Sequence, residues 1–130
     1  MFRNKIIFAL VLSALIPTTF AYSDVESGSE YYDSVSYLSD KDVVEGYGGD
    51  EFKPENKINR AEFIKILIEA AFDDIPPATE ECFTDVSTEL WYAPYVCYAK
   101  QQNIVGGYED GTFLPEKNIN FAEAAKIIVR

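Results

Sequence analysis

The most informative absence in this 130-residue sequence is histidine, of which there is none. Histidine is the commonest general base, the usual partner of a serine or cysteine nucleophile, and the commonest metal ligand in proteins. Its absence counts against most hydrolytic and metal-dependent enzymes. The acidic pair Glu109-Asp110 also lacks the number and spacing of ligands found in a calcium-binding loop. We therefore expect no required metal, no cofactor and no catalytic residue.

Basic residues are scarce as well. The chain has 11 Lys and Arg against 22 Asp and Glu, which gives a net charge of −11 at pH 7. Such a surface repels the phosphate backbone of nucleic acids, so nucleic-acid binding is not expected. It also offers no basic patch for anionic lipid headgroups. Acidity often serves solubility alone, and the charge by itself identifies no partner.

Long hydrophobic runs are missing too. The longest covers residues 6–16 and is broken by a serine, whereas about 20 apolar residues are needed to cross a bilayer. Arg3 and Lys5 precede this run, and Thr19 and Ala21 place small residues at the −3 and −1 positions of a cleavage site. This layout predicts a secretory signal peptide, 1–21, and a secreted chain. An uncleaved N-terminal membrane anchor is the alternative interpretation.

Only two cysteines are present, Cys82 and Cys97. Two thiolates exclude a zinc site made of four. In an exported chain the pair favours a disulfide, which closes a loop of about 15 residues and contributes about 2–3 kcal/mol. Such a bridge would join a linker to the first helix of the second half of the chain. Two free thiols remain the alternative.

An internal repeat is the strongest positive signal. At an offset of 61 and without a gap, residues 22–69 match 83–130 at 17 of 48 positions. Identities at turns, caps and apolar positions together indicate a duplicated supersecondary unit. The identical residues of the first copy are Asp24, Val25, Tyr31, Val35, Tyr37, Val44, Gly46, Tyr47, Phe52, Pro54, Glu55, Ile58, Asn59, Ala61, Glu62, Lys65 and Ile66.

Each unit is predicted to form a helix, a loop and a second helix, which makes the chain all-α. Apolar residues recur at helical spacing from Trp91 to Ala99. Asn59 and Asn120 are predicted N-caps of the second helices, each followed three residues later by a glutamate, as in a capping box. Asp24, like its counterpart in the second copy, is expected to cap the first helix or the turn after it.

The second helix of the first copy is apolar on most of its surface. Its polar residues form one narrow stripe of Glu62, Lys65 and Glu69. A helix of this kind must be covered on most sides, so we expect the second helices of successive units to pack on each other in a shared bundle. The predicted organisation is a signal peptide at 1–21, repeat 1 at 22–72, a proline-rich acidic linker at 73–82, and repeat 2 at 83–130.

The residues of both copies resemble the S-layer homology (SLH) family. The second copy carries FTDV at 83–86, NIVGGYEDGTFLP at 103–115 and INFAE at 119–123. The first copy has YSDV at 22–25, VVEGY at 43–47, FKP at 52–54 and INRAE at 58–62, so its motif arginine, Arg60, is Phe121 in the second copy. The resemblance covers nearly all of 22–130.

This resemblance implies a fold and a function. The fold is a spindle in which three such repeats share a central helical bundle, and two repeats here correspond to a partial spindle. The function is non-covalent attachment of an exported protein to secondary cell-wall polysaccharide, often carrying pyruvate ketals, in a groove between repeats. The expected location is the cell wall or S-layer surface, with no membrane contact after signal cleavage.

Arg60 is a candidate ligand-binding residue on grounds of its own. It lies opposite the polar stripe of its helix and in the first helical turn, where the helix dipole disfavours a cation. Such violations of local preference are typical of functional sites, and a guanidinium suits a carboxylate such as a pyruvyl group. An ion pair with a nearby acid is the structural alternative.

Other candidates for glycan binding complete the predicted site, and each has a structural alternative. Lysines on helices are usually solvated, Trp91 at this spacing is more typical of a core, and the glycines are explained by turns alone. The remaining candidates are Glu62, Lys65, Gly46, Trp91, Gly106, Gly107 and Lys126.

Three functional classes are compatible with these residues. The leading hypothesis is a non-catalytic anchoring module that binds cell-wall polysaccharide. The second is a structural module that assembles with other SLH repeats or chains without binding glycan. The third is a glycosidase that uses two carboxylates, which the sequence favours least because no pocket is evident around any pair.

Overall fold

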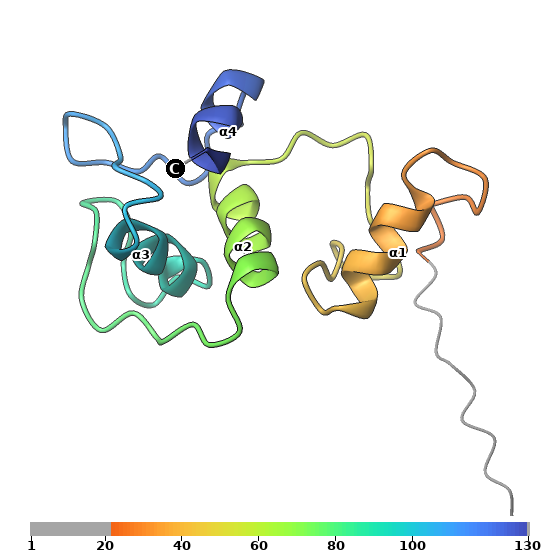
Figure 1. Ribbon diagram of the computed structural model, residues 1–130, viewed down its shortest axis with the longest axis horizontal. Coiled ribbons are helices and arrows are strands. Elements are labelled where there is room, and N and C mark those ends of the chain that lie inside the picture. Colours follow the sequence, from red (N-terminus) through yellow and green to blue (C-terminus); the bar gives the residue numbers. More distant parts are fainter. Residues whose placement is uncertain (1–21, 130) are drawn as a thin grey trace, which may run out of the picture.

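The structure is a computed structural model that describes residues 22–129; the predicted signal peptide lies outside the described residues. Within this range the one β-type contact is an isolated bridge between Asn59 and Asn118. The prediction of an all-α chain is therefore confirmed. The helices, shown in Figure 1, are α1 (Tyr32–Asp40), α2 (Arg60–Ala71), α3 (Ala93–Gln101) and α4 (Phe121–Ile128).

The second helix of each unit begins with the predicted capping box. The Asn59 side chain accepts a hydrogen bond from the Glu62 amide at 2.9 Å, and the Glu62 carboxylate accepts one from the Asn59 amide at 2.8 Å. Asn120 and Glu123 repeat both bonds at the start of α4. An N-cap of this kind contributes about 1 kcal/mol, so local sequence fixes where both helices begin.

The two aspartates of the SDV and TDV motifs have a role other than helix capping. The Asp24 carboxylate accepts hydrogen bonds from the amides of Phe52 at 2.8 Å and Lys53 at 2.6 Å. Asp85 makes the same pair of bonds with the amides at 113–114. The bond from Phe52 is the largest cause of a lowered pKa at Asp24. Each aspartate thus ties the start of its unit to the loop before its second helix.

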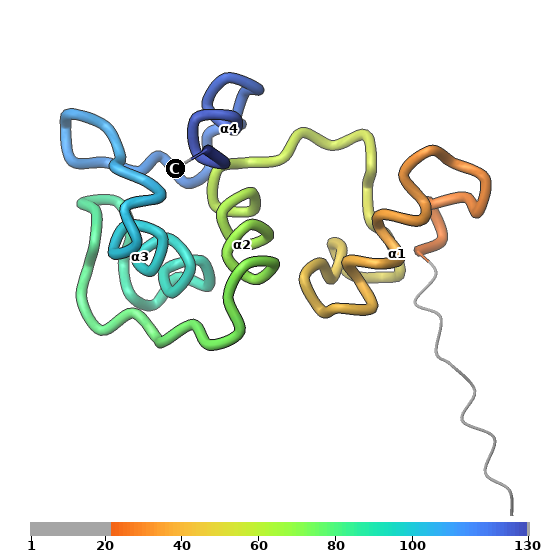
Figure 2. The backbone as a smooth tube through the Cα atoms, viewed as in Figure 1, coloured from red at the N-terminus to blue at the C-terminus, as the bar shows by residue number. Residues whose placement is uncertain are grey.

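The main core lies between α2 and α3, which pack side by side (Figure 2). The α2 residues Ala61, Ile64 and Ile68 have no exposed surface. The α3 side contributes Val96 and Ala99, which are equally buried. Other members of this core are Phe83, Val86, Tyr92, Ala93, Cys97, Val105, Phe113 and Ile127.

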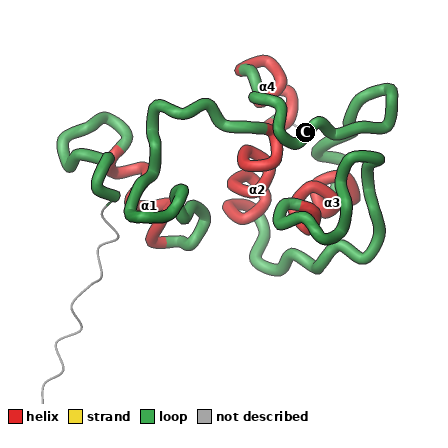
Figure 3. The backbone as a smooth tube through the Cα atoms, turned by 180° about the vertical axis from the view of Figure 1, so that it is seen from behind, coloured by secondary structure: helices red, strands yellow, loops and turns green. Residues whose placement is uncertain are grey.

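The packing of α2 differs from the expectation that second helices pack chiefly on each other. The principal partner of α2 is α3, the first helix of the following unit. In Figures 1 and 3, α4 lies beyond the N-terminal end of α2, and it reaches the core through Ile127, which is 8% exposed. The linker brings α3 alongside α2, whereas the loop before α4 carries the chain past the end of α2.

The first unit has a small core of its own. Its buried apolar residues are Val25, Val35, Val43 and Val44. Figure 1 shows α1 on the side of α2 away from α3, joined to α2 by the loop at 41–59. This loop and α2 enclose the space in which the candidate site lies.

Candidate functional site

A cleft of about 440 Å³ lies between the loop and α2 of the first unit, and Trp91 of the second unit borders it. Its volume falls within the range of about 300–1,000 Å³ that is typical of small-molecule sites. Four of the predicted glycan-binding residues line it, namely Gly46, Glu62, Lys65 and Trp91. The other lining residues are Val43, Val44, Glu45, Tyr47, Phe52, Lys53, Pro54, Asn56, Ile58 and Ile66.

The loop wall of the cleft depends on the backbone at Gly46. This glycine has a φ of +70°, and a Cβ added to it would lie 2.5 Å from the Glu51 carbonyl oxygen. The neighbouring Tyr47 amide donates to that same oxygen at 2.8 Å. A side chain at position 46 would disrupt this turn, so Gly46 acts by holding the turn that presents Tyr47 to the cleft.

Tyr47 and Glu62 connect the loop wall to the helix wall. The Tyr47 hydroxyl donates a hydrogen bond to the Glu62 carboxylate at 3.0 Å. Burial, followed by this bond and the charge of Glu62, raises the pKa of Tyr47. The hydroxyl therefore stays protonated at neutral pH. Because Glu62 also completes the α2 capping box, its carboxylate anchors the cleft wall and the helix start together.

Two lysines supply positive charge. The Lys65 ammonium lies 2.9 Å from the Glu69 carboxylate and 3.9 Å from Glu45. Lys53 lies 3.4 Å from Glu51, with its ammonium 5.7 Å from the centre of the Tyr47 ring. The Lys53–Glu51 pair borders solvent, and such pairs contribute little free energy, so an anionic ligand can take over the hydrogen bonds of the Lys53 ammonium at low cost. The Lys65–Glu69 pair is mostly buried, with side chains 18% and 20% exposed.

Trp91 forms the wall contributed by the second unit. Its side chain is 54% exposed, whereas the adjacent Tyr92 is 5% exposed and belongs to the core. The two rings meet edge to face, with centroids 5.2 Å apart. Packing therefore fixes the position of Trp91 while leaving one part of its surface open in the cleft. The expectation that Trp91 serves the core does not hold; Tyr92 takes that role.

Arg60, the first sequence candidate, does not line the cleft. It is 6% exposed, and its Nε donates a hydrogen bond to the Phe113 carbonyl oxygen at 2.9 Å. Its guanidinium carbon lies 4.7 Å from the centre of the Phe113 ring and 5.0 Å from that of Tyr108. Among the salt bridges formed within residues 22–129, none involves this guanidinium. Instead, two aromatic faces and a carbonyl hold it at the seam between the units.

The remaining predicted residues lie in the second unit, away from this cleft. Gly107, the counterpart of Gly46, has a φ of +68°, and a Cβ there would lie 2.4 Å from the Phe83 ring. Gly106 and Lys126 are exposed. Lys126 occupies on α4 the position that Lys65 occupies on α2, which makes it a natural reference for Lys65.

Sequence reasoning missed Tyr47 and Lys53. The signal for Tyr47 was present, because tyrosine and glutamate recur at the same separation in both copies. Tyr108 donates to the Glu123 carboxylate at 3.0 Å, as Tyr47 does to Glu62. An identical pair at identical spacing in both repeats indicates a contact that each unit makes within itself.

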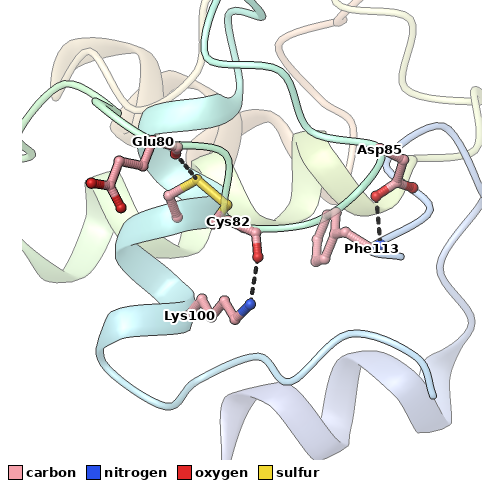
Figure 4. Close-up of a disulfide and its surroundings, with 6 residues drawn as sticks. Glu80, Cys82, Asp85, Lys100 and Phe113 are labelled. Atoms are coloured by element: carbon pink, nitrogen blue, oxygen red, sulfur yellow. Dashed lines mark hydrogen bonds between the residues drawn. A yellow bond between two sulfur atoms is a disulfide. The ribbon is translucent and has the colours of Figure 1, made fainter. Parts of the chain in front are cut away.

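The predicted disulfide between Cys82 and Cys97 is confirmed, with a Cα–Cα distance of 5.4 Å. Figure 4 shows the bridge, the ammonium of Lys100 on the Cys82 carbonyl, and the bond between Asp85 and the Phe113 amide. The bridge attaches the end of the linker to α3. It thereby helps hold α3 and the adjacent Trp91 segment in place.

Between residues 22 and 129 no group of three His, Cys, Asp or Glu side chains is arranged to hold a metal ion. In the same range no helix has both the length and the apolar character needed to cross a bilayer.

Comparison with known proteins places the two units in a family. The S-layer homology domain matches residues 21–64 and 83–125. A cellulosome-anchoring protein of Acetivibrio thermocellus is 40% identical over 87 residues, which cover 65% of this chain and 20% of that protein. A surface layer protein of Brevibacillus choshinensis is 28% identical over 134 residues, covering 98% of this chain and 12% of that protein.

The relatives are much longer than the matched region. An endoglucanase of a Bacillus species is 26% identical over 141 residues, covering 96% of this chain but 14% of the endoglucanase. The chain thus spans about a fifth or less of the curated relatives named here. Two matched repeats, with the duplicated capping boxes and glycine turns at corresponding positions, establish that the chain belongs to the S-layer homology family.

Proposed function

We propose that this chain is a non-catalytic module that anchors an exported protein at the cell surface by binding cell-wall polysaccharide in the cleft of its first unit that Trp91 of the second unit borders. The names of the relatives, a cellulosome-anchoring protein and a surface layer protein, support the anchoring role. The observation that carries the binding site is the cleft itself, because it combines exposed aromatic surface with two ammonium groups.

The chemistry of the cleft suits an acidic sugar. Tyr47 and Trp91 offer ring surface to the apolar face of a pyranose, while their polar edges can reach its hydroxyl groups. Lys53 and Lys65 can donate hydrogen bonds to a carboxylate, such as that of a pyruvate ketal. The net charge of −11 would otherwise repel an anionic glycan. Binding therefore depends on these local cations.

Lys65 and Lys126 provide a matched test, because they occupy the same position on α2 and α4. We expect Lys65→Ala to reduce co-sedimentation with purified cell-wall polysaccharide at least tenfold, and Lys126→Ala to leave it close to the wild-type level. Trp91→Ala is expected to lose binding, with Leu90→Ala as its control. Circular dichroism of each variant checks that the fold is intact.

The glycan itself can be varied as well. Mild acid removes ketal-linked pyruvate, and we expect wall material treated in this way to bind more weakly, because Lys53 and Lys65 lose their anionic partner. Equal loss of binding in the Lys65 and Lys126 variants would contradict the cleft assignment. A wild-type chain that ignores wall polysaccharide altogether would contradict anchoring through glycan and favour a module that acts through protein contacts.

A further inference from the structure

The two units differ in what lies beside the tyrosine–glutamate pair that each of them contains. In the second unit the Lys117 ammonium donates hydrogen bonds to the Glu123 carboxylate at 2.8 Å and to the Tyr108 hydroxyl oxygen at 3.0 Å. The hydroxyl itself donates to the same carboxylate oxygen at 3.0 Å. The hydroxyl and the carboxylate of the second unit thus hold an ammonium group together.

The ammonium group changes the protonation of its partner. The hydrogen bond from Lys117, followed by that from the Asn120 amide, lowers the pKa of Glu123 to about 2. The same bond to Glu123, the first of several causes, raises the pKa of Lys117. Both shifts mean that the charged forms stabilise each other, so this arrangement suits a cation better than a neutral donor.

In the first unit the position of that ammonium is open. The residue that corresponds to Lys117 is Asn56, which carries no charge. Tyr47 donates to Glu62 at 3.0 Å, the same distance as in the second unit. The Glu62 carboxylate takes part in no ion pair within residues 22–129. The first unit therefore repeats the two acceptors without the lysine.

The two lysines of the cleft do not fill this position. Lys53 pairs with Glu51 at 3.4 Å, and Lys65 pairs with Glu69 at 2.9 Å and with Glu45 at 3.9 Å. Both ammonium groups thus have carboxylate partners other than the one in the tyrosine–glutamate pair.

The open position faces the ligand. Tyr47, Asn56 and Glu62 all line the cleft, and Tyr47 is 50% exposed. The Tyr47 hydroxyl donates its proton to Glu62, so its oxygen is left as an acceptor for a second donor. A group that donates to both oxygens can therefore enter from the cleft.

We propose that the Tyr47–Glu62 pair is a subsite for a protonated amine, carried by a deacetylated amino sugar of the wall polysaccharide. The amine donates to the Glu62 carboxylate and to the Tyr47 hydroxyl oxygen, as Lys117 does in the second unit. The inference rests on the proposed function and adds a cationic group to the acidic one expected beside Lys53 and Lys65. The ligand therefore carries charges of both signs.

A ligand with both charges suits the acidic surface of this chain. The net charge of −11 repels a purely anionic glycan. An amine on the same glycan offsets part of that repulsion, and the Glu62 carboxylate gives it a specific partner. Because Lys117 already occupies the equivalent position in the second unit, the first unit alone of the two is open to a ligand amine.

The first test compares two substitutions that each remove one negative charge. Glu62→Gln keeps the capping box, in which Gln serves as well as Glu. We expect it to weaken co-sedimentation with purified wall polysaccharide about tenfold, the effect of losing one charge-assisted hydrogen bond. Glu123→Gln is the matched control and should not weaken binding. A ligand with acidic groups alone would bind both variants more tightly, which would overturn the proposal.

Asn56→Lys gives the first unit the lysine that the second unit has. It should weaken binding although it adds positive charge, because its ammonium takes the position of the amine. Gln102→Lys, an equal charge change at an exposed residue outside the cleft, should not weaken binding. Tighter binding by Asn56→Lys than by the wild type would overturn the proposal. Circular dichroism of each variant checks that the fold is intact.

The amine can also be removed from the polysaccharide. Acetic anhydride converts free amines to N-acetyl groups and leaves carboxylates charged. We expect the treated polysaccharide to bind the wild-type chain about tenfold more weakly, through loss of the same hydrogen bond. On treated material Glu62→Gln should cause no further loss, because the amine and the carboxylate act as a pair. Unchanged binding of the treated polysaccharide to the wild type would overturn the proposal.

A monosaccharide probe separates this inference from the proposed function. In an NMR titration, glucosamine should shift the ring signals of Tyr47 but not those of Tyr108, and N-acetylglucosamine should shift neither. A chain that shows these shifts but ignores wall polysaccharide would contradict anchoring through glycan and support the amine subsite. A chain that binds the polysaccharide equally well with Glu62→Gln would support anchoring and refute the subsite.

Discussion

The two second helices, α2 and α4, start alike and end in different surroundings. Both begin with an asparagine cap and a reciprocal glutamate, and both carry lysine at the same place in the motif. Yet Ile68 of α2 has no exposed surface, while Val129 at the corresponding position after α4 is 82% exposed. The difference arises from what lies next to each helix, because α3 and the second loop cover α2.

This comparison separates features that depend on neighbouring residues from features that depend on the following unit. Capping and helical propensity act within a few residues and appear in both copies. Burial depends on a following unit that supplies a first helix and a loop, and in this chain only α2 has one among the described residues. A single SLH unit thus specifies its helices locally but depends on its successor for most of its core.

The largest expected effect on stability concerns Ile68, the buried residue of the pair Ile68 and Val129. Ile68→Ala should lower the free energy of unfolding by about 2–5 kcal/mol, because it leaves a cavity between α2 and α3. Val129→Ala, at the matching position, should change it by about 0.5 kcal/mol or less, since little of that side chain is buried. Urea unfolding measures both. Similar losses in the two variants would refute the contrast in burial.

Arg60 offers a smaller and more specific test. Arg60→Ala removes the bond to the Phe113 carbonyl and the contacts with two rings, and we expect a loss of about 1–3 kcal/mol in the free energy of unfolding. The exposed Lys57, near the same helix start, is the matched control and should lose about 0.5 kcal/mol or less on replacement by Ala.

The same variant tests whether Arg60 joins the two units or binds the ligand. Under mild conditions in which Arg60→Ala stays folded, it should still co-sediment with wall polysaccharide. Complete loss of binding by a fully folded Arg60→Ala would return this residue to the ligand site, as its position in the sequence motif had suggested.

What could be predicted from the sequence divides in the same way, between local features and contacts with distant parts of the chain. The helix starts and the cysteine pairing depend on near neighbours or on the only possible partner, and they were predicted correctly. That Arg60 binds a ligand stays a prediction, because its conflict with the helix dipole has two possible solutions: a bound anion, or aromatic faces with a carbonyl. Only the fold shows that Tyr108 and Phe113, about 50 residues away along the chain, supply the second.

The cleft residues were partly predictable for a related reason. Gly46, Glu62 and Lys65 belong to the repeated motif, so the repeat indicates them. Trp91 has no counterpart in the first copy, where Glu30 stands, and its spacing resembles that of a core residue. Whether it or Tyr92 enters the core depends on how α3 is rotated against α2, which the sequence pattern does not determine.

The smallest expected effect concerns Tyr95, whose bond to Glu69 exists only where α3 meets α2. Burial, followed by this bond and by negative charge nearby, raises the pKa of Tyr95 to about 12. The raised pKa means that the folded state holds the phenolic proton more tightly than the unfolded state does. This contribution to stability is fully present below the ordinary tyrosine pKa of about 10 and is lost as pH rises from there towards 12.

Tyr95→Phe tests both the pH dependence of stability and the contact between α2 and α3. We expect it to lower the free energy of unfolding by about 0.5–1.5 kcal/mol at neutral pH, through loss of the hydrogen bond. It should also flatten the decline in stability measured by urea unfolding between about pH 9 and pH 11. Tyr37→Phe, at the exposed position on α1 that corresponds to Tyr98, is the control and should leave both quantities nearly unchanged. An equally steep alkaline decline in Tyr95→Phe would show that other tyrosines, such as Tyr47 and Tyr92, dominate it, and that the seam contributes little to the alkaline response.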